Sequence, residues 1–292
     1  MVADAAYAHC LRLAQAHYEN FPVASRLLPR AARPHIAAIY AFARVADDFA
    51  DEGDRTVENR LALLDAWGRR LDAAVSDQVD ADGSDAAHIF TALANTMRTC
   101  MLERSLFDDL LSAFRQDVTT TRYETWADVL DYCRRSADPI GRLVLRVSGY
   151  RDARLDRLSD AVCTALQLTN FWQDIERDWA KGRVYVPQDI LRAAGADESD
   201  LARRRISDAW RVALADVSTR TRNLFLEGRP IADAVSGRLR WELRATWLGG
   251  IRILDGLERA RFDVFARRPT LSRADLPAMA WHMLTWRQLQ RR

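Results

Sequence analysis

The sequence predicts an all-α protein in which residues 1–292 form a single domain. Glycine and proline are sparse, at 12 and 8 of 292 residues, and apolar residues recur at intervals of three and four. No pair of segments shows the alternating pattern that is typical of neighbouring strands. Hydrophobic residues make up 49% of the chain, which is enough for a substantial core and excludes a disordered protein.

Individual helices are expected where this periodicity runs without a break, and their ends are expected where glycine, proline and short polar residues gather. The expected helices cover residues 4–18, 30–51, 56–76, 85–98, 103–115, 125–149, 152–180, 198–226, 231–257 and 273–290.

Charge, cysteine content and the N-terminal sequence narrow the class of protein. Lys+Arg and Asp+Glu are nearly balanced at 43 and 41, which argues against a nucleic-acid-binding protein. The four cysteines form no C-x-x-C pair, so reduced thiols and a cytoplasmic location are expected. The N-terminus lacks a basic region followed by an apolar stretch, and no run of about 18 apolar residues occurs. Neither a signal peptide nor a membrane-spanning helix is therefore expected.

Acidic side chains follow an unusually apolar helix near residue 40. Residues 36–43 are apolar on every side, as in a fully buried helix, and they continue without a break into an R-x-x-D-D-x-x-D motif. Tyr40, Arg44, Asp47 and Asp51 are spaced by four, three and four, so they share one helix face. Buried acids need a cation or water. Taken alone, the motif fits equally well with a helix that emerges into solvent near its end.

A second helix shows the same combination and favours the cation. Gln167, Asn170, Asp174 and Asp178 are spaced by three, four and four on another mostly apolar helix. Two such helices can face each other across a cavity, where oxygen ligands suit Mg²⁺, which shares phosphate oxygens with the protein. The nearby residues 181–185 include Lys and Arg, which are donors for a diphosphate. Together the two motifs predict a magnesium site that binds a diphosphate.

With these motifs the sequence resembles the squalene/phytoene synthase family of isoprenoid enzymes over nearly its whole length. The matching segments are His17–Phe21, Leu27–Pro29, Ala38–Ala41, both acid motifs, Tyr132-Cys133 with Gly141, Gly182–Pro187 and Ile253–Asp255. The resemblance implies an all-helical isoprenoid-synthase bundle around a central cavity. It also implies that the acid motifs hold Mg²⁺ against the substrate's diphosphate, while the prenyl chains lie in the apolar interior.

Within this family, residues 21–25, 134–145 and 170–174 resemble the bacterial hydroxysqualene synthases. Those enzymes convert presqualene diphosphate and water to hydroxysqualene and diphosphate in hopanoid biosynthesis. Gln173 stands where relatives usually carry Arg, and Arg177 where they carry an acid. With glutamine at position 173, the diphosphate site lacks the positive charge of that arginine. This argues against the coupling of two farnesyl diphosphates, which requires two diphosphates to be bound. No G-x-G-x-x-G follows a strand, so a separate reductase is expected downstream. The resemblance also implies a separate presqualene diphosphate synthase that supplies the substrate.

The resemblance and the two stripes together suggest a role for each polar residue. The expected magnesium ligands are Asp47, Asp51, Asn170 and Asp174, with Asp48 and Asp178 as second ligands or acting through water. The expected catalytic residues are Asp47, Asp51, Asp174 and Tyr132. The expected substrate contacts are His17, Phe21, Tyr40, Arg44, Gln167, Phe171, Lys181, Arg183 and Tyr185. Among these, the cationic side chains stabilise the departing diphosphate, the aromatic rings line the carbocation, and Tyr40, Tyr132 or Gln167 positions the quenching water.

Three other functions share part of these patterns. Head-to-head coupling enzymes that make presqualene diphosphate, dehydrosqualene or phytoene have the same acid motifs. A non-catalytic binding protein on this fold could discard its acids, yet all six metal-site positions are intact. A class I terpene cyclase would have the acid motifs but not the matches at 17–21 and 182–187.

Residues 277–287 carry Trp and Arg beside an apolar face. This pattern suits a transient contact with a membrane surface, or a helix that caps the domain.

Overall fold

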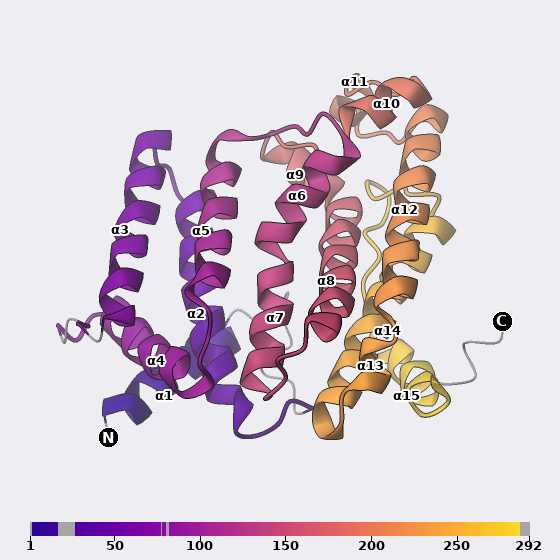
Figure 1. The fold of residues 1–292 in the computed structure, drawn as a ribbon. Coiled ribbons are helices and arrows are strands. Elements are labelled where there is room, and N and C mark those ends of the chain that lie inside the picture. The colour runs from indigo at the N-terminus through magenta and orange to yellow at the C-terminus, as the bar shows by residue number, and fades with distance from the viewer. Residues whose placement is uncertain (1, 17–26, 77, 80–81, 287–292) are drawn as a thin grey trace. The chain divides into compact units, whose positions relative to one another are not determined.

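The computed structural model describes residues 2–16, 27–76, 78–79 and 82–286, and the chain divides into two compact units. Unit 1 comprises residues 1–119 and 139–156, and unit 2 comprises residues 120–138 and 157–292. Within the described residues every regular element is a helix, apart from one isolated bridge between Arg122 and Val184, so the all-α prediction is confirmed (Figure 1). That the whole chain forms one domain stays a prediction.

Unit 1 is a set of helices around an aromatic core. Its helices are α1 (Val2–Ala16), α2 (Ala32–Asp51), α3 (Val57–Val75), α4 (Asp85–Cys100), α5 (Arg104–Thr119) and all but the first residue of α7 (Asp138–Val147). The ring of Phe42 on α2 lies 6.1 Å from Trp67, 6.0 Å from Phe90 and 5.3 Å from Phe107, measured between centroids. These contacts join α2 to α3, α4 and α5, and they position the helix that carries the first acid motif.

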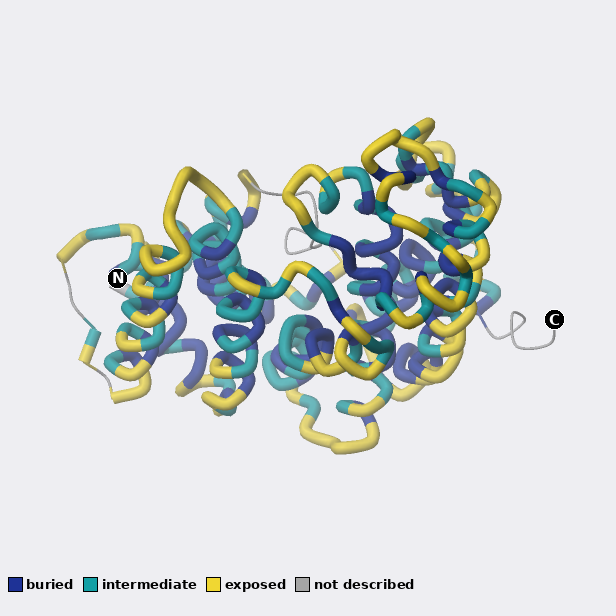
Figure 2. The backbone as a smooth tube through the Cα atoms, turned by 90° about the horizontal axis from the view of Figure 1, so that it is seen from above, coloured by how far each residue is buried: buried dark blue, intermediate teal, exposed yellow. Residues whose placement is uncertain are grey.

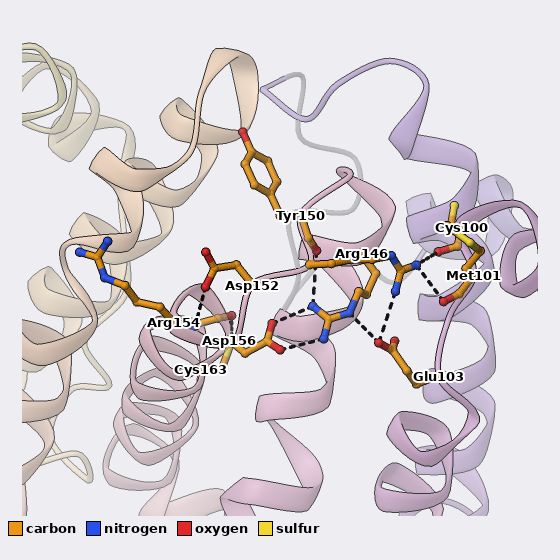
Figure 3. Close-up of polar contacts among 11 residues, drawn as sticks. Cys100, Met101, Glu103, Arg146, Tyr150, Asp152, Arg154, Asp156 and Cys163 are labelled. Carbon is orange, nitrogen blue, oxygen red and sulfur yellow. Dashed lines mark hydrogen bonds and ion pairs between the residues drawn. The ribbon is translucent and has the colours of Figure 1, made fainter.

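An arginine joins the end of α7 to the start of the next helix (Figure 3). Both terminal nitrogens of Arg146 donate to the carboxylate of Asp156, each at 2.7 Å, and its Nε donates to Glu103 at 2.8 Å. Arg151 donates to the carbonyl of Met101 at 2.8 Å and lies 3.4 Å from the same Glu103 oxygen. This network, in which Arg146 and Asp156 are largely buried, ties the loop between the two helices to the N-terminal end of α5.

Unit 2 contains the remaining helices, packed around large aromatic side chains. Its helices are α6 (Trp126–Ser136), α8 (Ala153–Gln173, of which the first four residues belong to unit 1), α9 (Ile175–Ala180), α10 (Gln188–Ala194), α11 (Ser199–Ala202), α12 (Asp208–Gly228), α13 (Ile231–Ala234), α14 (Gly237–Arg259), the 3₁₀ helix η2 (Arg273–Asp275) and α15 (Leu276–Leu284). Trp172 and Trp210 are fully buried, and each indole N–H donates a hydrogen bond, to Thr221 and to the carbonyl of Asp197.

Two glycines allow close helix contacts in unit 2. Because Gly228 has no side chain, α12 can approach α8 closely. A Cβ at this position would lie only 2.5 Å from a methyl of Val162. A Cβ at Gly250 would lie 2.5 Å from the ring of Phe225, which brings α14 against α12. Along the helices buried and exposed residues alternate, whereas the turns are mostly exposed (Figure 2).

Several expected helices are divided in the structure. The helix expected over 125–149 is two helices, because Pro139 lacks the N–H needed to continue the first one. The helix expected over 152–180 is interrupted at Asp174, and that over 231–257 is interrupted before Gly237, whose φ is +60°. The helix expected over 198–226 breaks after α11, where Arg204 has a φ of +52°.

The remaining differences concern short segments. Helix α10 was not expected from the sequence, because its seven residues are too few to show a periodicity. The helix expected over 273–290 ends at Leu284 and is preceded by a 3₁₀ turn, and residues 287–290 lie outside the described residues. None of the helices in the described part of the chain is long and apolar enough to cross a membrane.

Candidate active site

The first acid motif forms a half-buried stripe near the C-terminal end of α2. Tyr40, Arg44, Asp47, Asp48 and Asp51 are all of intermediate exposure, whereas Ile36 to Ile39 are buried. Arg44 Nη2 lies 2.6 Å from Asp48 Oδ1, and Nη1 lies 3.8 Å from Asp47 Oδ2. The predicted stripe therefore exists, and the arginine is in an ion pair with its own motif.

Two polar atoms of this stripe fit a further charged ligand. In the described chain, Asp48 Oδ1 and Arg44 Nε are buried and make no hydrogen bond. The ion pair between the two side chains is short but lacks hydrogen-bond geometry, so it leaves the carboxylate oxygen able to accept a cation and the Nε able to donate to an anion. Carboxylate oxygens are the donors that Mg²⁺ prefers, so this set of side chains fits the metal that the family implies.

The position of these acids is unfavourable for the helix itself. Asp47, Asp48 and Asp51 lie in the last turn of α2, which contains no basic residue, and the helix dipole disfavours negative charge there. Two arginines that follow the helix compensate. Arg60 donates to the carbonyls of residues 49, 50 and 53, at 3.2, 2.7 and 2.8 Å, and Arg55 donates to that of residue 52 at 2.7 Å.

The hydroxyl of Tyr40 is kept protonated by its surroundings. Burial raises its pKa most, Arg44 lowers it, and the carboxylates of Asp48 and Asp47 raise it further, so the net pKa lies above its ordinary value. A phenol with a raised pKa is a hydrogen-bond donor throughout the neutral range.

The second acid motif is centred on Asp174, the single residue between α8 and α9. Asn170 Nδ2 donates a hydrogen bond to Asp174 Oδ2 at 2.9 Å. Arg268 donates two hydrogen bonds to the same carboxylate, from Nε to Oδ1 at 2.6 Å and from Nη2 to Oδ2 at 3.1 Å. The side chain of Asp174 is 14% exposed. Gln167 and Asp178 flank it on the helices and are half-buried. The predicted stripe is therefore in place around an acid that already accepts hydrogen bonds from two side chains.

The segment that supplies Arg268 is held by two consecutive residues of the motif. Gln173 Nε2 donates to the carbonyl of Pro269 at 2.5 Å, next to the ion pair between Asp174 and Arg268. Gln173, which the sequence analysis treated as a missing charge, thus acts as a tether in the structure. The sequence analysis missed Arg268, because it lies 94 residues beyond its partner and belongs to no periodic pattern.

The basic segment after α9 makes a tight turn. Lys181 is exposed and Arg183 is half-buried, and Gly182 between them has a φ of +76°. Arg122, which the sequence analysis did not identify, donates to the carbonyl of Gly182 at 2.7 Å, and the N–H of Val184 donates to the carbonyl of residue 121 at 3.0 Å. These contacts hold the two cationic side chains on a fixed piece of backbone.

Four buried rings gather between α6, α8 and this segment. The ring of Tyr185 stacks on Phe171, with centroids 3.7 Å apart and planes 6° apart. Tyr132 lies 5.9 Å from Phe171, and Tyr123, a residue that the sequence analysis missed, lies 5.8 Å from Tyr185. Three of the predicted aromatic contacts are therefore neighbours within unit 2.

Some predictions are left open. His17 and Phe21 lie outside the described residues. The first acid motif belongs to unit 1 and the second to unit 2, each described within its own unit. Over the residues that the structure describes, no three His, Cys, Asp or Glu side chains gather as a ready-made metal site, so the assignment of magnesium ligands stays a prediction.

Comparison with solved structures identifies the fold as that of the all-α isoprenoid synthases. The chain matches squalene synthase HpnC from Alicyclobacillus acidocaldarius with a TM-score of 0.82 and 42% identity, over 89% of this chain and 95% of that one. It matches a dehydrosqualene synthase in complex with a ligand with a TM-score of 0.86 over 98% of both chains. At 20% identity, this second match shows the fold alone.

The chain belongs to the squalene/phytoene synthase family, whose model matches residues 14–275. A hydroxysqualene synthase from Rhodopseudomonas palustris is 40% identical over 73% of this chain and 70% of its own length. Another from Zymomonas mobilis is 38% identical over 74% and 71%. A 15-cis-phytoene synthase from Synechococcus elongatus is 28% identical over 97% of this chain and 90% of its own length.

Proposed function

We propose that this protein is an enzyme that converts presqualene diphosphate and water to hydroxysqualene and diphosphate, as a step in hopanoid biosynthesis. The observation that carries the proposal is the 38–40% identity to relatives named hydroxysqualene synthase. The two acid stripes support it, because a prenyl diphosphate must lose a highly charged leaving group. A separate presqualene diphosphate synthase supplies the substrate, and a reductase consumes the alcohol.

The first step is rupture of the carbon–oxygen bond, in which the electron pair leaves with the diphosphate. Asp47, Asp51, Asn170 and Asp174, with Asp48 and Asp178 as further ligands, would hold Mg²⁺, and the ion would supply a Lewis acid for this charge. Arg44, Lys181 and Arg183 neutralise the departing group by hydrogen bonds and charge, without proton transfer. The ion pairs of Arg44 with Asp47 and Asp48 support this role, because they hold its guanidinium beside two of the proposed ligands.

The second step is capture of the carbocation by water, in which the protonated alcohol loses one proton to the departed diphosphate. The faces of Tyr132, Phe171 and Tyr185 stabilise the cation through their quadrupoles. Phe171 and Tyr185 stack on each other and Tyr132 lies beside Phe171, so the three rings hold one another in place. Gln167 or a tyrosine hydroxyl orients the water. The protonated phenol of Tyr40 donates hydrogen bonds and does not act as a base.

Product analysis tests the reaction. Purified protein is incubated with presqualene diphosphate, Mg²⁺ and oxygen-18-labelled water, without reduced nicotinamide, and the products are analysed by mass spectrometry. We expect a C30 alcohol that carries the labelled oxygen and that disappears when EDTA is added. Unchanged presqualene diphosphate, together with coupling of farnesyl or geranylgeranyl diphosphate, would instead identify a head-to-head coupling enzyme, the function that the phytoene synthase relatives favour.

Two substitutions test the metal-binding side chains. Asp47→Asn and Asp174→Asn each replace a charged ligand by a neutral side chain of nearly the same shape, so both should abolish turnover. Matched controls are Asp65→Asn in unit 1 and Asp131→Asn in unit 2, since these half-exposed acids pair with arginines outside the motifs. Turnover close to wild type in both motif variants would show that the acids have another role.

A further inference from the structure

Exposed apolar side chains concentrate near the C-terminal end of the described chain. Of the ten large hydrophobic side chains exposed among the described residues, four lie between residues 271 and 284. They are Leu271 at 46%, Leu276 at 59%, Trp281 at 64% and Leu284 at 70% exposure. Single exposed hydrophobic residues are ordinary, but a contiguous group indicates a binding surface.

Three of these side chains share one face of α15. At 100° per residue, Leu276, Ala280, Leu284, Pro277 and Trp281 follow one another around about 140° of the helix. All five are exposed. We call this set of five residues the α15 apolar face.

The opposite side of α15 is firmly attached to unit 2. The buried ring of Trp286, which follows the helix, lies 5.2 Å from Trp247 and has Arg229 above it at 4.5 Å. Arg229 donates to the carbonyl of Trp286, and Arg244 donates to that of Met283 at 2.9 Å. Both arginines are themselves buried. Their hydrogen bonds fix the C-terminal end of α15 on unit 2, while the apolar face of the helix stays exposed.

The sequence around this face is basic. Residues 271–292 contain four arginines and one acid, Asp275, a formal charge of +3 in 22 residues, whereas the whole chain has +2. The single acid is already paired with Arg252 at 2.5 Å. An exposed apolar face within a basic stretch of sequence is complementary to a surface that has negative headgroups and a hydrocarbon interior.

We propose that the α15 apolar face docks on an anionic lipid bilayer. The helix lies in the plane of the interface, with Leu276, Trp281 and Leu284 among the outer acyl segments, and the headgroup phosphates attract the basic sequence around it. The inference rests on exposure and charge, and it does not depend on which prenyl diphosphate the protein uses. For an enzyme whose product is a C30 alcohol, docking of this kind places the protein where such a lipid dissolves.

Vesicle co-sedimentation tests the proposal on the full-length protein. One set of vesicles contains phosphatidylglycerol and phosphatidylethanolamine, and the other contains only phosphatidylcholine. We expect wild-type protein to bind the first set and to be released as salt is raised. The double variant Trp281→Ser/Leu284→Ser should bind at least tenfold more weakly, because burial of one such side chain already contributes more free energy than a tenfold change in partition requires.

The matched control is the double variant Val212→Ser/Leu226→Ser, which removes two exposed side chains of α12 in the same unit, 61% and 55% exposed. It should bind vesicles like wild type, and both double variants should keep the wild-type circular dichroism spectrum. Absence of wild-type binding to anionic vesicles, or equal losses in both double variants, would overturn the proposal. It would also be overturned if the α15 variant abolished a concentration-dependent dimer while vesicle binding persisted, since the face would then join two copies of the chain.

Discussion

The ion pair between Arg268 and Asp174 should be measurable as a coupling energy in the metal-free protein. Arg268→Gln removes both hydrogen bonds to the carboxylate, which lie at 2.6 and 3.1 Å. A hydrogen bond to a charged group is worth about 1.5–3 kcal/mol, and an exposed ion pair about 0.2–1 kcal/mol. With side chains 26% and 14% exposed, this pair lies between those limits, so we expect a loss of about 1–2 kcal/mol in the free energy of unfolding.

A double-mutant cycle isolates this energy from other effects of either substitution. Arg268→Gln, Asp174→Asn and the double variant are unfolded with urea in the presence of EDTA, and the three changes in free energy are combined. The matched control is Arg177→Gln, because the Nε of Arg177 lies 3.7 Å from the same carboxylate and its side chain is 62% exposed. A coupling energy below about 0.3 kcal/mol would refute the role assigned to Arg268. So would one no larger than the coupling energy between Arg177 and Asp174, measured by the same cycle with Arg177→Gln.

Three further predictions concern stability. Gly228→Ala forces a Cβ to within 2.5 Å of a neighbouring helix and should cost about 1–3 kcal/mol in urea unfolding, whereas Gly68→Ala, whose Cβ has ordinary contacts, should not destabilise. Arg146→Met leaves its largely buried carboxylate partner without a counter-charge and should cost about 3–5 kcal/mol, measured in the same way. Hydrogen bonds from Arg252 hold the pKa of Asp275 well below its usual range, so its contribution to stability is full above about pH 4 and falls as the pH drops further.

Each of these predictions has a distinct contrary result. If both glycine variants had the same stability, the close approach of α12 to α8 would be wrong. A small loss in Arg146→Met would mean that water replaces the guanidinium. Asp275→Asn should flatten the acid limb of the stability curve, so an unchanged pH dependence would show that the Arg252 contact is not formed in solution.

Local periodicity was sufficient to predict most of the helices. It did not predict the short helix α10 or the interruptions within longer helices. Residues 32–51 were predicted almost to the residue, because a long apolar run has one way to bury itself. The seven residues of α10 carry too little periodicity to be recognised. The interruption at Asp174 could not be predicted either, because the N–H groups of Asp174 and Asp178 keep their helical hydrogen bonds at 2.9 and 2.8 Å across it.

By itself the sequence determined which residues share a helix face. Spacings of three and four placed Arg44 beside Asp48, and Asn170 beside Asp174, since helical geometry is the same in every protein. Only the tertiary structure decided which distant residues complete these groups. Arg268 reaches Asp174 because a non-helical segment is tethered next to it, and Tyr123 joins the aromatic cluster because a short bridge pairs two loops. Such contacts depend on packing between elements far apart in the chain, and no local spacing encodes them.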